Sequence, residues 1–186
     1  MKTIKRSLLM ILLLTSVGFL FRGWIYRHVV TYKSVGTRTT YPASDKNFTQ
    51  YIDSCLDNQM QPDIKQIINL ALAITSERLT YTAEKNDIDP NLLFTSRNAH
   101  CVGYAAFFTT TCNYLLKKYD LADQWTAKRR IGQLYFLGTN IHPYFPTPFF
   151  KDHDFVTIEN KETGEILAVD PTVKDYLSID FVSYTR

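Results

Sequence analysis

The segment from residue 101 to residue 119 constrains this chain most, because its apolar residues recur at steps of three and four positions. That period is typical of a helix with one buried face. Cys101 is the first residue of the pattern, so we expect it to begin a core helix. In the first turn of a helix, unpaired backbone N–H groups and the positive end of the helix dipole stabilise a thiolate. The alternative is that Cys101 is an ordinary buried thiol, since free cysteines are often buried.

The composition indicates one globular domain behind a hydrophobic leader. At 186 residues the chain has room for one sizeable core, and its high aromatic content argues against disorder. The first 44 residues contain seven Lys or Arg and no Asp or Glu, so acidic residues outnumber basic ones by 18 to 14 from Asp45 onward. A nucleic-acid-binding domain needs a basic face, and we interpret the longest basic run, 128–130, as a solvated strand end. We therefore expect no nucleic-acid partner.

The three cysteines do not form a pattern that binds a metal or builds a disulfide framework. Their number is odd, and no two of them are arranged as Cys-x-x-Cys. Cys101 and Cys112 lie on one helix face but about 16 Å apart at 1.5 Å per residue, which is too far for a disulfide. We interpret Cys55 and Cys112 as core thiols, and we expect neither a metal nor another cofactor.

Residues 1–27 are predicted to be a signal anchor or a signal peptide. A short basic segment precedes an apolar run over residues 8–21, which is shorter than a bilayer core unless it extends to Tyr26. A small-x-small site at 16–18 would suit signal peptidase, but the apolar run continues past it. We favour an uncleaved membrane anchor. In either case we expect an exported domain, which is extracytoplasmic and membrane-anchored, or secreted if the leader is cleaved.

Residues 28–44 are interpreted as a linker, because they are polar and show no helical period. The domain then spans residues 45–186 and opens with two amphipathic helices. Farther along, residues 142–150 contain three prolines, which exclude a central strand or a helix. This stretch either walls a cleft or covers an edge of the core, and the sequence leaves both open.

Two β-rich runs near the C-terminus flank a polar turn that contains Gly164. This pattern predicts a hairpin. His153 opens the first run, and Asp170 closes the second run just before Pro171, which cannot donate to a strand ladder.

Together these motifs resemble the transglutaminase-like superfamily of papain-like thiol enzymes. The resemblance covers residues 64–172 and rests on a Cys at a helix start, a His at a strand start about fifty residues later, and an Asp at the end of the next strand. The matching segments are CVGYA at 101–105, HDFV at 153–156 and VDPT at 169–172. Two positions depart from the pattern. His100 stands where the family commonly has Gly, and Asp154-Phe155 stands where Ala-Trp is usual.

The resemblance implies an α+β, papain-like fold in which the helix that bears the nucleophile packs on a small antiparallel sheet. It implies a peptidase, amidase or transamidase that acts on a protein or peptide, such as one of the cell envelope, through a cysteine thioester. Cys101 would be the nucleophile, His153 the base and Asp170 the group that orients the imidazole, which are the roles that thiol chemistry requires. The backbone N–H of Cys101 would stabilise the oxyanion, with Asn98 and His100 as candidates for a second donor.

Two other interpretations stay open. The chain is a non-catalytic binding module with the same fold, or it is a zinc protein that uses Cys101, His100 and His153, although these lack a paired ligand spacing. We otherwise interpret His100 and His142 as ordinary loop histidines. Asp154 is a rival orienting acid, but alternation along a strand turns it to the face opposite His153.

The proposed triad also sets the register of the hairpin. In an antiparallel pair, the residue numbers of facing residues add up to the same value along the ladder. If His153 faces Asp170, then Glu159 faces Gly164, and residues 160–163 form a four-residue turn. A slip of one residue would turn Asp170 to the other face. We therefore expect both side chains on one face of the sheet, within hydrogen-bonding reach.

Overall fold

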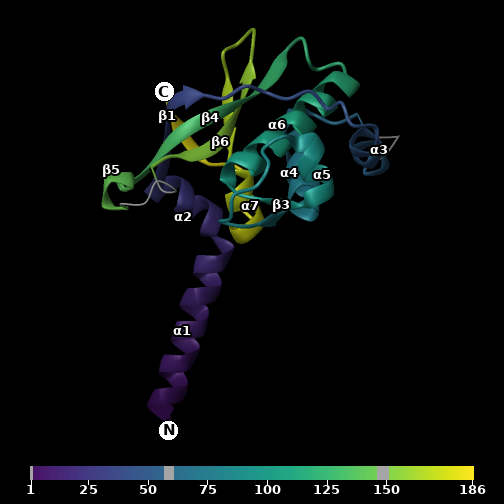
Figure 1. Ribbon diagram of the computed structural model, residues 1–186. Helices are drawn as coiled ribbons and strands as arrows, with labels where there is room; N and C mark the ends of the chain where they lie inside the picture. The colour runs from purple at the N-terminus through teal and green to yellow at the C-terminus, as the bar shows by residue number, and fades with distance from the viewer. Residues whose placement is uncertain (1, 57–60, 146–150) are drawn as a thin grey trace.

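The computed structural model describes residues 2–56, 61–145 and 151–186, and these residues form an α+β fold, as predicted (Figure 1). Most of the helices lie on one face of a mostly antiparallel sheet, while the first helix projects from the body as a stalk. The helices are α1 (Lys2–Leu20), α2 (Arg22–Val29), α3 (Lys46–Ser54), α4 (Ile64–Arg78), α5 (Pro90–Ser96), α6 (Cys101–Lys118), α7 (Pro171–Leu177) and the 3-10 helix η1 (His142–Tyr144). The strands are β1 (Val30–Thr37), β2 (Thr80–Tyr81), β3 (Asn98–Ala99), β4 (Trp125–Phe136), β5 (Thr139–Asn140), β6 (His153–Asn160), β7 (Ile166–Val169) and β8 (Ser183–Thr185).

Helix α6 is the centre of the main core and begins at Cys101, as its periodicity predicted. Every residue from Gly103 to Cys112 is buried, because α4 packs on one side of the helix and the sheet on the other. Gly103 lets the first turn approach its neighbours, since a Cβ there would lie 2.9 Å from the Ala99 Cβ. The two helices predicted after residue 44 are α3 and α4, each with an aspartate as its N-cap.

The main sheet has the strand order β7-β6-β4-β1-β8, with β5 paired to β4. All of its pairs are antiparallel except β1 with β8, which run parallel. Helix α6 packs against the face that carries Ala127 and Val156. The opposite face carries a second, smaller apolar cluster built on Tyr32 and Phe155, against which α2 packs through Tyr26. The sheet therefore lies between α6 and α2.

The linker prediction for residues 28–44 is wrong for its first half, because Val30–Thr37 forms β1, an inner strand of the sheet. This strand pairs with β4 along its length, with a register shift between Ser34 and Gly36 that breaks the alternation of side chains. Tyr32 is its only buried residue. A strand with one buried residue and a bulge lacks the period-two pattern, which is why this segment looks like a tether in the sequence.

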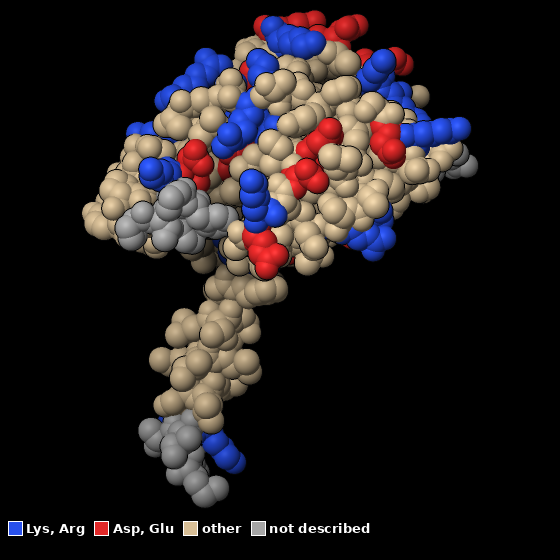
Figure 2. Space-filling model, in the orientation of Figure 1, with Lys and Arg blue, Asp and Glu red and all other residues tan. Residues whose placement is uncertain are grey.

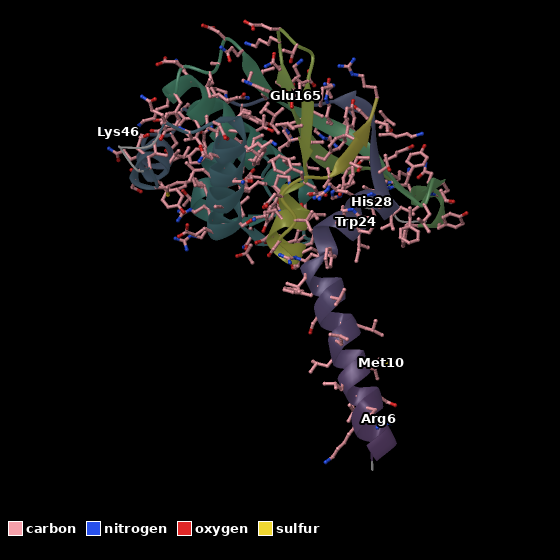
Figure 3. All side chains as sticks on the ribbon, turned by 180° about the vertical axis from the view of Figure 1, so that it is seen from behind. Arg6, Met10, Trp24, His28, Lys46 and Glu165 are labelled. Atoms are coloured by element: carbon pink, nitrogen blue, oxygen red, sulfur yellow. The ribbon has the colours of Figure 1, made fainter. Side chains whose placement is uncertain are left out.

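The predicted leader, residues 1–27, divides in two. Its first part, α1, projects from the body with apolar side chains exposed all round, and Arg6 lies near its free end (Figures 2 and 3). Its second part, α2, is held on the body: Arg22 Nε donates to the Leu177 carbonyl at 2.6 Å, and the Ser183 hydroxyl donates to the Arg27 carbonyl at 2.6 Å. Residues from Arg22 onward therefore belong to the domain.

The junction between α1 and α2 is sharply bent. Within residues 2–56, 61–145 and 151–186, no single helix is long and apolar enough to cross a bilayer. The segment from Lys5 through α2 meets the length and composition only as a pair of helices bent by 70°. Close to the bend, the rings of Trp24 and His28 lie 4.1 Å apart, centroid to centroid (Figure 3).

The C-terminal hairpin forms as predicted, but its register differs by two residues. Strands β6 and β7 pair with Val156 opposite Val169. Continued by one residue, this ladder brings Asp170 level with Phe155 rather than with His153. A slip of two residues keeps every side chain on its face, so His153 and Asp170 still share a face as diagonal neighbours.

The turn of this hairpin explains the difference in register. Gly164 adopts a φ of 73° inside the turn, so it does not join the ladder. The Asn160 N–H donates to the Glu165 carbonyl at 2.8 Å and closes the loop one residue later than predicted. The conformation of the turn therefore changes the register by two residues. Because this change is even, each side chain stays on its predicted face of the sheet.

Candidate active site

Cys101 lies in the first turn of α6, where it is partly buried. The preceding residue, His100, is the N-cap of the helix, and its Nδ1 accepts a hydrogen bond from the Val102 N–H at 3.2 Å. The same ring is hydrogen-bonded to the Cys101 sulfur. The interpretation of His100 as an ordinary loop histidine is therefore wrong, because capping the helix places its ring beside the thiol.

His153 and Asp170 lie within hydrogen-bonding reach on one face of the sheet, as predicted. His153 begins β6, and its Nε2 lies 2.6 Å from Asp170 Oδ2. Asp170 is fully buried at the N-cap of α7, where its Oδ1 accepts hydrogen bonds from the N–H groups of Thr172 at 2.9 Å and Val173 at 3.2 Å. Because the cap fixes one carboxylate oxygen, it directs the other toward the imidazole.

Cys101 and His153 form a coupled pair. Nε2 of the His153 imidazole is hydrogen-bonded to Asp170, so the hydrogen bond with the Cys101 sulfur is left to Nδ1. Burial alone would raise the pKa of the Cys101 thiol, but hydrogen bonds from His100 and His153 lower this pKa to about 6. The charge of His153 and the backbone N–H of Asp154 act in the same direction.

The pKa of His153 moves in the opposite sense. Burial would lower this pKa, but the charge of Asp170 and the hydrogen bond to it hold the pKa well above its ordinary value. Burial would likewise raise the pKa of Asp170, which the His153 charge instead keeps low. The thiolate and the imidazolium therefore stabilise each other near neutral pH.

Asp154 points to the sheet face opposite His153, as predicted, and fastens β6 to α6. Arg38 Nε donates to its carboxylate at 2.7 Å, and Arg129 lies 3.7 Å from it. Arg129 is 2% exposed and also donates to the Val102 carbonyl, in the first turn of α6, at 3.2 Å. Arg129 thus connects the strand that carries His153 to the helix that carries Cys101.

The basic run 128–130 is therefore not simply a solvated strand end. Lys128 and Arg130 both pair with Glu159 on one face of the sheet. Because side chains alternate along a strand, Arg129 between them turns to the other face and into the core.

Gly132 lies opposite His153 in the pairing of β4 with β6. A Cβ at this position would lie 2.5 Å from the Phe155 ring and 3.1 Å from the His153 carbonyl oxygen. A glycine is required here because the backbone of β4 passes so close to the strand that carries His153.

Two cavities meet at Cys101. The first, of about 280 Å³, is mainly apolar and is lined by Tyr81, Cys101, Leu134, Ile141, His142, Phe145, Asp152 and His153. The second, of about 400 Å³, is more polar and is lined by Ala83, Glu84, Lys85, His100, Cys101, Val102 and Asp152. A larger cavity of about 590 Å³, between the segment 41–43 and α6, contains no residue of the triad. The first two cavities therefore share Cys101 and Asp152 in their linings and both give access to the thiol.

The proline-rich stretch 142–150 contributes to the first cavity through His142 and Phe145, while residues 146–150 lie outside the described residues. The interpretation of His142 as an ordinary loop histidine is wrong. Its ring is buried, and its Nε2 accepts a hydrogen bond from the Leu134 N–H at 2.8 Å, which joins η1 to β4.

Of the two candidates for a second oxyanion donor, Asn98 and His100, only one lies beside the thiol. His100 contacts the sulfur, whereas Asn98 lies in β3 with its side chain exposed. The backbone N–H of Asp154 also reaches the sulfur. This donor has no signal in the sequence, because no residue type marks where a backbone N–H points.

Two further residues of the site, Tyr32 and Arg129, were also missed. The Tyr32 hydroxyl donates to Asp170 Oδ2 at 2.7 Å from a strand that has no clear signal in the sequence. Arg129 stands between two other basic residues, and only the alternation of β4 indicates that it differs from them.

In the part of the chain that the structure describes, no group of three or more His, Cys, Asp and Glu side chains is arranged to hold a metal ion. The zinc alternative therefore gains no support from the geometry. Comparisons of the chain with protein-family models, with curated proteins and with solved structures found no match.

Proposed function

We propose that this chain is a cysteine-dependent acyl-transfer enzyme with the papain-like core of the transglutaminase-like superfamily. The observation that carries the proposal is the series Cys101, His153 and Asp170, in which a thiol of pKa about 6 contacts an imidazole held 2.6 Å from a buried carboxylate. A structural cysteine needs none of these partners, and a binding module has no use for an activated thiol.

The first half-reaction is attack of the Cys101 thiolate on the carbonyl carbon of an amide or ester. The Cys101 N–H, at the positive end of α6, and the His100 ring are the donors for the charge that develops on the carbonyl oxygen. The His153 imidazolium gives its proton to the leaving amine or alcohol as the C–N or C–O bond breaks. The acyl group then remains on Cys101 as a thioester.

The second half-reaction transfers the acyl group to water or to an amine. Neutral His153 accepts a proton from the attacking molecule, the carbon–sulfur bond breaks, and the thiolate–imidazolium pair is restored. The product is a carboxylic acid in the first case and a new amide in the second. Asp170 keeps the ring in its orientation and stabilises the imidazolium throughout.

The two cavities at Cys101 support a protein or peptide substrate. The apolar cavity beside Tyr81 and Leu134 suits a large apolar side chain, and the cavity beside Glu84 and Lys85 suits a polar segment. A peptide bond that joins such residues would lie over the sulfur.

Trapping of an acyl-enzyme tests the proposal. The full chain in detergent is mixed with an activated acyl ester, such as an N-acetyl-leucine p-nitrophenyl ester, quenched in acid and analysed by mass spectrometry. We expect an acyl group on the peptide that contains Cys101, released by hydroxylamine, and none in a Cys101→Ala variant. Absence of acylation under conditions in which the protein is folded would favour the binding module.

We also propose that α1 attaches the enzyme to a membrane, with the domain outside the cytoplasm in the cell envelope. The support is the exposed apolar surface of α1 and the basic residues near its free end. End-sequencing of the native protein tests attachment. An intact N-terminus in the membrane fraction is expected, and a mature N-terminus at Phe19 would indicate a cleaved signal peptide instead.

A further inference from the structure

Asp170 Oδ2 accepts two hydrogen bonds, and only one of them comes from the triad. His153 Nε2 lies at 2.6 Å, and the Tyr32 hydroxyl lies at 2.7 Å. Tyr32 is fully buried in β1, and the centroid of its ring is 6.1 Å from that of His153. A side chain from the N-terminal part of the chain therefore completes the donors around the carboxylate.

The Tyr32 hydroxyl is itself held by a second tyrosine. The hydroxyl oxygens of Tyr26 and Tyr32 lie 2.7 Å apart. An ionised carboxylate only accepts hydrogen bonds, so Tyr32 uses its single proton on Asp170, and Tyr26 donates to the Tyr32 oxygen. This gives an ordered chain from Tyr26 to Tyr32 to Asp170, in which each bond strengthens the next.

Helix α2, which carries Tyr26, also holds the far end of α7. The Arg22 side chain donates to the carbonyls of Leu177 at 2.6 Å and Ser178 at 3.2 Å, at the C-terminal end of α7. Asp170 is the N-cap of the same helix. The segment from Arg22 to Tyr32 is thus fixed to both ends of the element that positions the orienting acid.

We propose that Tyr32 and, through it, Tyr26 are positioning residues for the triad, so that α2 and β1 are working parts of the active site. This inference rests on the proposed function. The Tyr32 hydroxyl fixes the position of Asp170 Oδ2 beside His153 Nε2. Its hydrogen bond also reduces the negative charge that Oδ2 presents to the imidazolium, and this limits how far Asp170 raises the pKa of His153.

Tyr32→Phe tests the role of the hydroxyl, because it keeps the ring in the core. We expect kcat/KM for an activated acyl ester to fall about tenfold, as for loss of one hydrogen bond to a charged group. We also expect the basic limb of its pH profile to move to higher pH, because Asp170 then presents more charge to His153. Tyr26→Phe should act in the same direction with a smaller loss.

Tyr184→Phe is the matched control. Tyr184 pairs with Tyr32 in the register of β1 and β8 and packs on the same ring, Phe155, with centroids 5.7 Å apart. Its hydroxyl has no place in the chain to Asp170, so both kcat/KM and the pH profile should match the unchanged protein.

An NMR titration of the His153 ring gives a readout that does not need turnover. Its pKa should rise in Tyr32→Phe and stay unchanged in Tyr184→Phe. If the unchanged protein neither acylates nor turns over an ester but the titration still shifts, the proposed function fails and the positioning role stands.

A Tyr32→Phe protein with the original His153 titration and the original kcat/KM would overturn the inference, as would an equal effect of Tyr184→Phe. If Tyr32→Phe does not fold, the same two measurements, kcat/KM and the His153 titration, are made on Tyr26→Phe. Tyr26 lies at the partly buried outer end of the hydrogen-bonded series, so its variant tests the same role.

Discussion

Cys101 and Cys112 lie on the same helix, about three turns apart, yet their surroundings make them different chemical groups. Cys101 is partly buried in the first turn, and its hydrogen bonds hold its pKa at about 6. Cys112 is fully buried among apolar side chains, and burial raises its pKa to about 12. Burial acts against the thiolate at both positions, but only Cys101 has hydrogen-bond partners that outweigh it.

The difference shows that the fold, and not the helix alone, creates the candidate nucleophile. The start of α6 supplies the open N–H groups, His100 supplies a capping ring, and β6 supplies both an imidazole and a backbone donor. Each of these lies at the N-terminal end of α6, where two cavities meet at the thiol. In the middle of the helix the same side chain fills space in the core.

The largest effect should follow from removing the reactive thiol itself. We expect Cys101→Ala to abolish acyl transfer, a loss on the order of 10⁶-fold where a nucleophile is removed, while the fold is retained. Cys112→Ala should keep full activity and lower the free energy of unfolding by about 1 kcal/mol, because it removes one buried atom. Kinetics and urea unfolding of the two variants check this. Activity that survives in Cys101→Ala would contradict the assignment.

The next largest effect should come from the orienting acid. We expect Asp170→Asn to lower kcat by about 10²–10⁴-fold, because an amide neither stabilises the imidazolium nor selects the correct tautomer. The amide oxygen still caps α7, but the amide nitrogen cannot accept the hydrogen bond of the buried Tyr32 hydroxyl, so the free energy of unfolding should fall by about 1–3 kcal/mol. Asp154→Asn, on the other face of the sheet, is the comparison variant. A greater loss of kcat in Asp154→Asn than in Asp170→Asn would reverse the two roles.

A smaller effect on activity, with a clear effect on stability, is expected for Arg129. Arg129→Met removes the guanidinium that links Asp154 to the Val102 carbonyl and should lower the free energy of unfolding by about 3 kcal/mol. The control Lys128→Met removes a half-exposed ion pair and should cost at most about 1 kcal/mol. Urea unfolding measures both. Equal costs would show that the buried position of Arg129 does not matter.

Much of the site could be predicted from the sequence because its parts are local patterns. The periodic stretch after Cys101 specifies a core helix that begins there, and the two β-rich runs specify the hairpin. The hairpin register was wrong by two residues, since Gly164 lies inside the turn. The faces were still correct, because an even shift does not change them.

The missing parts depend on contacts between segments distant in the sequence. Nothing local distinguishes β1 from a tether, because Tyr32 is its only buried residue and a bulge breaks its alternation. Likewise, alternation separates Arg129 from its two neighbours, but which face of β4 meets α6 is decided by packing. The residues that support the triad are therefore visible only in the folded chain.

The most direct test of the central claim is the pH dependence of alkylation of the two helix thiols in the folded protein. Iodoacetamide is applied from pH 4.5 to 10 to a Cys55→Ala variant, and each cysteine is read separately by mass spectrometry. The midpoint matters more than the rate, because a thiolate of low pKa is also less nucleophilic. We predict that labelling of Cys101 rises with a midpoint near pH 6 and that Cys112 stays unlabelled until the protein unfolds. A midpoint for Cys101 near 8.5, the ordinary pKa of a free cysteine, would contradict the account.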